Sequence, residues 1–333
     1  MTAAGARGET AGQIVGVLGL GGDAAATADA LAERRRALGD AVGADVTLRT
    51  ANALFPQRGY PFLEPFLGLL RTRFGSEARP LDFAGAPEAA RGAINGWVAE
   101  RTGQKIPELI PPGVLPAGTR LALVNAVYFK GAWQRPFKPS QTLHRPFTPA
   151  GGDPVHVPFM RQTGRFLYAE ADGIQILELP YTGGRLVMTL ALPQPGKTLA
   201  DAAAPLFRGR AASGLAPVEV AVAVPRFSFT SFRNAGATLR ALGVRDAFDA
   251  AKADLSVMNG TRDLFLAAVL HKAFIEVNEA GTEAAAATGA AVGVTSLPQP
   301  PAAAFTADRP FVFAIRETAS DTLLFLGTLA NPE

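Results

Sequence analysis

No cysteine occurs among the 333 residues of the sequence. This absence excludes disulfide bonds, thiolate metal sites and a cysteine nucleophile. Histidine is almost as scarce, and none of the three histidines, His144, His156 and His271, has a second histidine or a carboxylate at the spacing of a zinc site. The sequence also lacks the G-x-S-x-G pattern that marks a nucleophilic serine. We therefore expect no metal, no cofactor and no catalytic residues in this protein.

Long apolar runs and a strong charge of one sign are missing as well. No stretch of 18 residues is continuously apolar with large side chains, so we expect no membrane-spanning helix. The first residues do not follow the order of a signal peptide. The formal net charge is only +3, and the one dense basic run, residues 33–36, lies on a predicted helix. A solvated helix face explains this run, and a polyanion or nucleic-acid site is the less favoured alternative.

A glycine-rich segment near the N-terminus carries the best enzyme signal. Gly19, Gly21 and Ala24 fit the loose dinucleotide fingerprint G-x-G-x-x-A between a β-like and a helical stretch. Such a segment would bind a pyrophosphate with backbone N–H groups at a helix N-terminus. The following residues do not alternate between strands and helices as a parallel nucleotide-binding sheet requires. A glycine-rich connection between two helices is therefore the favoured interpretation, and a dinucleotide-binding enzyme is the minor alternative.

The order of the predicted elements indicates the fold class. Hydrophobic residues make up 48% of the chain, enough for a sizeable core. Apolar spacing predicts helices early in the chain, and closely spaced β-rich segments separated by turn residues dominate from residue 143 onward. This distribution is typical of an α+β fold with large, mostly antiparallel sheets. No linker composition is found, so we predict one domain over residues 1–333. The predicted helices are 24–38, 60–74, 87–102, 198–208 and 234–242, and the first predicted strands are 45–55 and 119–133.

One late segment has an unusual composition. Residues 279–292, EAGTEAAAATGAAV, follow a predicted strand and contain four consecutive alanines, although neither flank looks helical. No charged residue occurs between Ala284 and Ala307, whereas an exposed loop is normally polar. The segment therefore has a composition suited to two environments.

Seven motifs in chain order resemble the serpin family and extend through nearly the whole sequence. They are GARGET (5–10), ANALF (51–55), INGWVAERTGQKIPELIPPG (94–113), LVNAVYFKGAWQRPF (123–137), VPRFSF (224–229), LHKAFIEVNEAGTEAAAATG (270–289) and RPFVFAIRE (309–317). The resemblance implies three mostly antiparallel sheets, eight or nine helices and an exposed reactive-centre loop at about residues 279–304. It also implies suicide inhibition of a serine protease. In this mechanism the protease cleaves the loop and is trapped as an acyl-enzyme while the loop inserts into the large sheet.

The resemblance assigns the start of the loop as the hinge that inserts. The hinge residues are Glu279, Gly281, Thr282, Glu283, Ala284, Ala285, Ala286, Ala287 and Thr288. As a strand of period two, residues 282, 284, 286 and 288 would share one face, and the charge of Glu283 would lie on the other. Small side chains suit a strand that must enter between two others. A serpin-like protein that only binds or carries a ligand is the alternative, because such a protein need not keep this segment insertable.

Two further pairs follow from the same resemblance. We expect Glu279 to lie near Arg226 with Trp133 packed beneath, where a partly buried ion pair would hold the sheet closed and its loss would favour polymerisation. We also expect Asn125 and His271 to form a buried hydrogen-bonded pair under the strands that open.

The reactive bond depends on how the loop is counted. Counting from Gly281 places cleavage between Thr295 and Ser296, whereas counting back from residue 309 points near Gln299. The first count is favoured because Leu297 and Gln299 are each followed by proline, which most serine proteases refuse after the cut. Thr295 suits a shallow pocket of the elastase or subtilisin kind, and the partner is expected to be such a protease, with neither nucleic acid nor membrane involved.

The start of the sequence resembles the late part of the family's second helix. We therefore expect that the first helix, the following strand and half of the second helix are missing, together with any signal peptide. The location is unknown from the sequence, and an extracellular or periplasmic one is favoured. The protein is expected to be a monomer that can polymerise.

Overall fold

The computed structural model describes residues 1–19, 23–41, 46–209, 214–282 and 300–332. The hinge residues from Glu283 to Thr288 and the expected reactive bond between Thr295 and Ser296 lie outside the described residues. The chain forms two compact units. Unit 1 comprises Met1–Asp40, Leu48–Tyr128 and Thr230–Phe274, and unit 2 comprises Ala41–Thr47, Phe129–Phe229 and Ile275–Glu333. The single domain over 1–333 stays a prediction.

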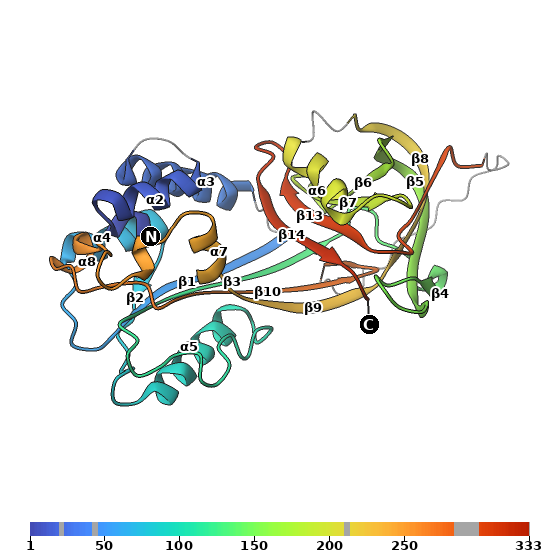
Figure 1. The fold of residues 1–333 in the computed structure, drawn as a ribbon. Helices are drawn as coiled ribbons and strands as arrows, with labels where there is room; N and C mark the ends of the chain where they lie inside the picture. Colours follow the sequence, from blue (N-terminus) through green and yellow to red (C-terminus); the bar gives the residue numbers. More distant parts are fainter. Residues whose placement is uncertain (20–22, 42–45, 210–213, 283–299, 333) are drawn as a thin grey trace. The chain divides into compact units, whose positions relative to one another are not determined.

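The helices of the described residues agree well with the sequence. Pro87 occupies the first turn of the helix predicted over 87–102, where its missing N–H costs no hydrogen bond. The helices are α1 (Thr2–Gly5), α2 (Gly8–Leu18), α3 (Ala24–Ala41), α4 (Glu64–Leu69), α5 (Pro87–Arg101), α6 (Leu199–Arg208), α7 (Gly236–Ala241) and α8 (Ser256–Asn259) (Figure 1). None of them is long and apolar enough to cross a membrane.

The glycine-rich segment does not follow a strand. Residues Gly8–Leu18 form the helix α2, which ends at Gly19 in a left-handed conformation (φ 62°), a common helix C-terminus. The β-like stretch expected before the fingerprint is therefore helical, because its apolar residues Ile14 and Val17 pack on a core cluster of unit 1. The dinucleotide-binding alternative thus lacks the strand that it requires, and helices lie on both sides of the glycine-rich segment, of which Gly21 lies outside the described residues.

One sheet has six strands in the order β2-β1-β3-β11-β10-β9. Its strands β3 and β10 pair in parallel within unit 1, from Ala268 opposite Ala122 to Phe274 opposite Tyr128. The sheet is thus mixed, because β1 with β2 and β3 with β10 pair in parallel, whereas β11 is antiparallel to both β3 and β10. The strands are β1 (Val46–Pro56), β2 (Glu77–Ala78), β3 (Leu121–Ala132), β9 (Phe227–Asn234), β10 (Ala268–Asn278) and β11 (Gly281–Thr282).

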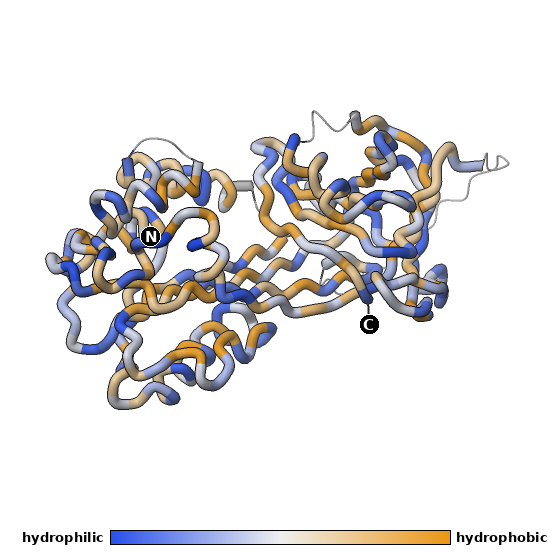
Figure 2. The backbone as a smooth tube through the Cα atoms, viewed as in Figure 1, coloured by the Kyte–Doolittle hydropathy of each residue, from blue (hydrophilic) through white to orange (hydrophobic). Residues whose placement is uncertain are grey.

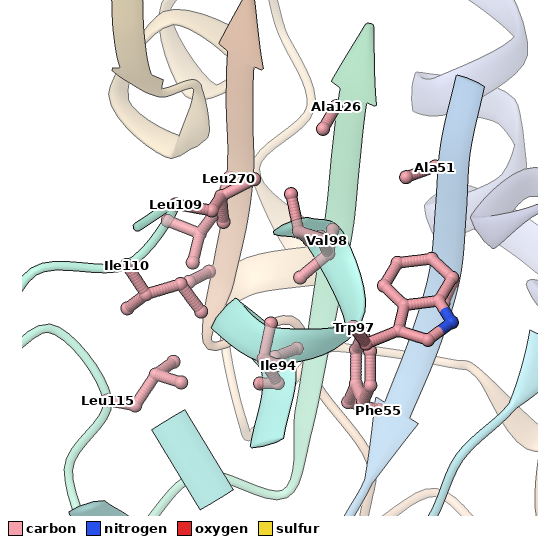
Figure 3. Packing of buried hydrophobic residues seen from close by; sticks show 14 of the residues in the cluster. Ala51, Phe55, Ile94, Trp97, Val98, Leu109, Ile110, Leu115, Ala126 and Leu270 are labelled. Atoms are coloured by element: carbon pink, nitrogen blue, oxygen red, sulfur yellow. The ribbon is translucent and has the colours of Figure 1, made fainter. Parts of the chain in front are cut away.

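Alternate residues of β3 enter two different cores of unit 1. Ala122 and Val124 belong to the cluster under α5, whereas Leu121 belongs to the cluster on the other face. Helix α5 contributes Ile94, Trp97 and Val98 to the first cluster, where the Trp97 ring meets Phe55 edge-on at 5.5 Å (Figure 3). Burying each such side chain stabilises the fold by about 1.5–3 kcal/mol. The amphipathic spacing of α5 is therefore what fixes this helix on the sheet.

The other sheet, in unit 2, has eight strands, with seven in the order β12-β8-β5-β6-β7-β13-β14 and β4 paired to β5. Three sheets were expected. Two are found in the described residues because the 17-residue β5 pairs with β4, β8 and β6 and joins the smaller sheets. Its strands are β4 (Leu143–Phe147), β5 (Val155–Ala171), β6 (Ile174–Pro180), β7 (Leu186–Pro193), β8 (Ala216–Pro225), β12 (Ala303–Thr306), β13 (Phe311–Glu317) and β14 (Leu323–Leu329). Every residue of β7 and β13 is buried, and Figure 2 shows apolar residues recurring along the strands of both units.

Candidate functional site

Two residues of the hinge, Gly281 and Thr282, lie between two strands. After β10 ends at Asn278, the chain turns through residues 279 and 280 and returns as β11. Thr282 pairs with Val277 of β10 and with Gly131 of β3, and both pairings are antiparallel. In unit 2, the start of the hinge is thus an inserted strand of two residues.

Gly281 is required by the narrow gap at this point. Its φ is 151°, and a Cβ atom placed on it would lie 2.0 Å from the carbonyl oxygen of Gly131 and 2.7 Å from the Cα of Ala132. No side chain can move to relieve such a contact, because both atoms belong to the backbone. Only glycine allows the hinge to enter here without moving β3.

A second feature of this region is an ion pair on the turn between β10 and β11. The carboxylate of Glu279 is only 7% exposed and accepts hydrogen bonds from Arg226 Nε at 2.7 Å, from Arg226 Nη2 and from the Thr142 hydroxyl. Burial alone would raise the pKa of Glu279, but the hydrogen bonds from Arg226 and Thr142 together outweigh burial and hold this pKa below its usual value. The Arg226 side chain is 43% exposed and borders an open groove of about 640 Å³. The pair is therefore buried on the carboxylate side only.

Aromatic rings connect the hinge to the sheet of unit 2. The buried Trp133 donates its indole N–H to the carbonyl oxygen of Asn278 at 2.9 Å and stacks on Tyr181, with ring centres 4.6 Å apart. The hydroxyl of Tyr181 lies 2.7 Å from the hydroxyl of Thr282, and burial raises the pKa of Tyr181 above its usual value. Each of these polar atoms is satisfied, as buried groups must be. We call Trp133, Thr142, Tyr181, Arg226 and Glu279 the hinge cluster.

The third group is a row of hydrogen-bonded polar side chains in unit 1, on the strands β1, β3 and β10. His271 and Asn125 are opposite residues of β10 and β3, and Nδ1 of His271 is bonded to the side-chain oxygen of Asn125. The amide of Asn125 in turn donates to the side-chain oxygen of Asn52 on β1. Burial lowers the pKa of His271, so the neutral imidazole is the stable form. We call Asn52, Asn125 and His271 the mid-sheet cluster.

The structure brings together the residue pairs that the sequence singled out, and it adds further hydrogen-bond partners to each pair. Arg226 contacts Glu279, and Asn125 contacts His271, but the roles assigned to these pairs stay predictions. Trp133 donates hydrogen bonds to the carbonyl oxygens of Asn278 and Ala280, the residues on either side of Glu279. Sequence reasoning missed Thr142, Tyr181 and Asn52. The motif ANALF contains Asn52, but a polar residue in an apolar strand was the only signal of its role.

Among the described residues, no group of three or more His, Asp or Glu side chains could hold a metal ion. His144 and His156 both lie in unit 2, on β4 and β5, and belong to neither cluster. The two clusters contain satisfied hydrogen bonds, and the backbone at Gly281 is close-packed.

Comparison with known proteins gives a consistent picture. The family model described as "Serpin (serine protease inhibitor)" matches residues 1–332. Leukocyte elastase inhibitor A of Mus musculus is 39% identical over 304 residues, covering 87% of this chain and 79% of that protein. Antithrombin-III of Mus musculus is 38% identical over 291 residues, covering 86% of this chain and 62% of that protein.

Solved structures are similar over the whole chain. Serpin48 of the insect Tenebrio molitor superposes with a TM-score of 0.87 at 31% identity, covering 100% of this chain and 88% of that one. Human thyroxine-binding globulin superposes with a TM-score of 0.89 at 28% identity, covering 99% of this chain and 88% of that one.

Proposed function

Because the chain belongs to the serpin family, we propose that it inhibits serine proteases of the elastase or subtilisin kind as a suicide substrate. The protein is an inhibitor and not an enzyme. The protease serine attacks the carbonyl carbon of Thr295, the peptide bond to Ser296 breaks, and the new amine leaves with a proton. The inhibitor stays attached to the protease as an ester. The freed hinge inserts between β3 and β10 before water hydrolyses this ester.

One observation carries the proposal. The two-residue strand β11 occupies the gap between β3 and β10 and is antiparallel to both, so further insertion only has to lengthen it. Within unit 1 the same two strands pair directly over seven residue pairs, from Ala268 to Phe274. The sequence after Thr282 continues with small residues, which such a strand needs.

The energetics support insertion after cleavage. A strand inserted between β3 and β10 replaces the one ladder of backbone hydrogen bonds between them by two ladders, one on each side of the new strand. Seven further inserted residues therefore add about seven hydrogen bonds at about 1 kcal/mol each. A gain of about 7 kcal/mol is comparable to the stability of a whole domain. The uncleaved protein is then a kinetic trap, because it reaches this more stable arrangement only slowly while the loop is intact.

The experiment is incubation with elastase and with subtilisin, followed by denaturing gel electrophoresis and mass spectrometry. A band stable in SDS at the summed mass of both proteins, with the cut between residues 292 and 298, is the expected result. The cleaved protein should also melt at a higher temperature than the intact one. Cleavage without such a band would reject suicide inhibition and favour a serpin-like protein that only binds a ligand.

Two hinge variants make the test specific. Ala286→Glu adds a charge on the face that Thr282 shares, whereas Ala285→Glu adds the same charge on the face of Glu283. Ala286→Glu should turn the inhibitor into a substrate, because a charge stranded inside the sheet opposes insertion. Ala285→Glu should still form the complex. Equal behaviour of the two variants would contradict insertion with this register.

The covalent complex, the monomeric state and polymerisation on heating are part of the same proposal. Size-exclusion chromatography before and after mild heating tests the last two. An extracellular or periplasmic location is proposed as well, and fractionation of the source cells tests it.

A further inference from the structure

A second pocket of unit 2, distinct from the groove beside Arg226, is lined by residues of the strands β5, β6 and β7. It has a volume of about 530 Å³, within the range of small-molecule sites. Its apolar wall is formed by Phe166, Leu167, Pro180 and Val187, from the strands β5, β6 and β7, and its polar rim includes two arginines. These strands are neighbours in the sheet of unit 2.

The two arginines of this rim are Arg135 and Arg165. A guanidinium nitrogen of Arg135 lies against the backbone of β5 and donates to the carbonyl oxygen of Arg165 at 3.4 Å. Both arginines are exposed, and neither forms an ion pair within 4.0 Å in the described part of the chain. Glu219 is opposite Arg165 across the strand pair but makes no ion pair with it. Glu178 also lines the pocket and is itself buried and already bonded.

The pocket is connected to Trp133 by shared walls. Arg135, Phe166 and Pro180 also line a small crevice of about 10 Å³ that reaches Trp133. Trp133 donates to Asn278 in the turn before the hinge and stacks on Tyr181, whose hydroxyl contacts the hinge residue Thr282. A molecule pressed against Phe166 and Pro180 would therefore restrict the rings that anchor β11.

We propose that this pocket binds a small amphiphile with a carboxylate head, of the fatty-acid class, and that the bound molecule stabilises the anchoring of the hinge. The carboxylate pairs with the guanidinium groups of Arg135 and Arg165, whose fork of N–H donors matches its two oxygens. The alkyl chain lies on Leu167 and Pro180, the partly exposed apolar residues of the pocket lining, and is removed from water. The proposal goes beyond protease inhibition, and its test does not depend on that function.

The test is calorimetric titration of the full-length protein with dodecanoate below its micelle concentration. Saturable binding of one molecule per chain is expected, whereas dodecanol, which has no charge, and acetate, which has no chain, should each bind at least fivefold more weakly. Arg135→Gln and Arg165→Gln should each weaken dodecanoate at least fivefold. The matched control is Arg161→Gln, which removes an exposed arginine of the same strand β5 outside this pocket. Absence of saturable binding, or equal loss in Arg161→Gln, would overturn the site.

The connection to the hinge has its own readout. Hydrogen exchange of the peptide covering residues 275–282 should slow at least threefold in saturating dodecanoate. The fluorescence of Trp133, measured in a Trp97→Phe variant because the chain has two tryptophans, should change on binding. Binding that leaves both signals unchanged would overturn the stabilisation of the hinge.

Discussion

Replacing Glu279 by glutamine tests the ion pair on the turn before the hinge. Glu279→Gln keeps the size of the side chain and one carbonyl-type acceptor, but it removes the negative charge. The turn that carries this residue leads directly into β11, so a weaker anchor should let the hinge leave its place between β3 and β10. We expect lower stability and faster polymerisation on mild heating.

The magnitude follows from the geometry. The carboxylate accepts three hydrogen bonds, two of them from Arg226, and bonds to charged groups are worth about 1.5–3 kcal/mol each in buried sites. The other partner, Arg226, is 43% exposed and regains water when the charge is lost, so the full cost of breaking a buried pair does not apply. We expect Glu279→Gln to lower the free energy of unfolding by about 1–2 kcal/mol.

The pH dependence gives the sharper measurement. The pKa of Glu279 in the folded protein lies below its ordinary value of 4.5. Its ionised form therefore stabilises the fold fully above pH 4.5, and this contribution is lost as the pH falls from 4.5 through the lowered pKa. Denaturant midpoints of parent and Glu279→Gln should differ at pH 7 and converge as the pH falls from 4.5 through the lowered pKa.

The control is Glu219→Gln on β8, an exposed glutamate without an ion pair among the described residues. Its stability should follow that of the parent at every pH. A difference between parent and Glu279→Gln that does not shrink on acidification would refute the ion-pair reasoning. Polymerisation of Glu279→Gln at the parent's rate would refute its role in holding the hinge.

Three further predictions concern the same strands. Gly281→Ala should lower the free energy of unfolding by about 1–3 kcal/mol, because its Cβ would meet a backbone oxygen at 2.0 Å, and faster proteolysis of the loop would report expulsion of the hinge. Asn125→Ala should cost about 1–3 kcal/mol by leaving His271 without its partner, measured by the denaturant midpoint, and a loss below 0.5 kcal/mol would contradict the bond. The lowered pKa of His271 means that stability falls as the pH drops below its ordinary value of 6.5, and His271→Gln should remove this part of the pH dependence.

Much of the fold was predictable because its elements carry local signals. The helix over 87–101 has an N-terminal proline and an apolar stripe, and the strand β3 has alternating residues for two cores. The number of sheets was not predictable. It depends on where one long strand, β5, finds its partners, and no local pattern of residues encodes that choice.

The clusters were predictable only in part for a related reason. Arg226, Glu279, Asn125 and His271 belong to motifs whose order identified the family. The contact of Tyr181 with Thr282 joins residues about a hundred positions apart, and a tyrosine between apolar strand residues looks the same in sequence whether or not its hydroxyl is bonded. Such contacts follow from the packing of the strands.

We predict that the mid-sheet cluster controls both stability and the rate of insertion, because His271 and Asn125 are opposite residues across a strand pair. In the parallel pairing of β10 with β3, His271 faces Asn125, and a strand inserted there would move the two apart by a further 4.8 Å or so. The bond between them cannot survive this separation, so it must break before the hinge advances. Asn125→Ala removes that barrier together with the stability it provides, and conversion of the uncleaved protein to a more heat-stable form should accelerate. Gly281→Ala offers the contrast, since it hinders the hinge itself while the barrier stays, and conversion should slow. If both variants changed the conversion rate in the same direction, the bond would not be the step that limits insertion.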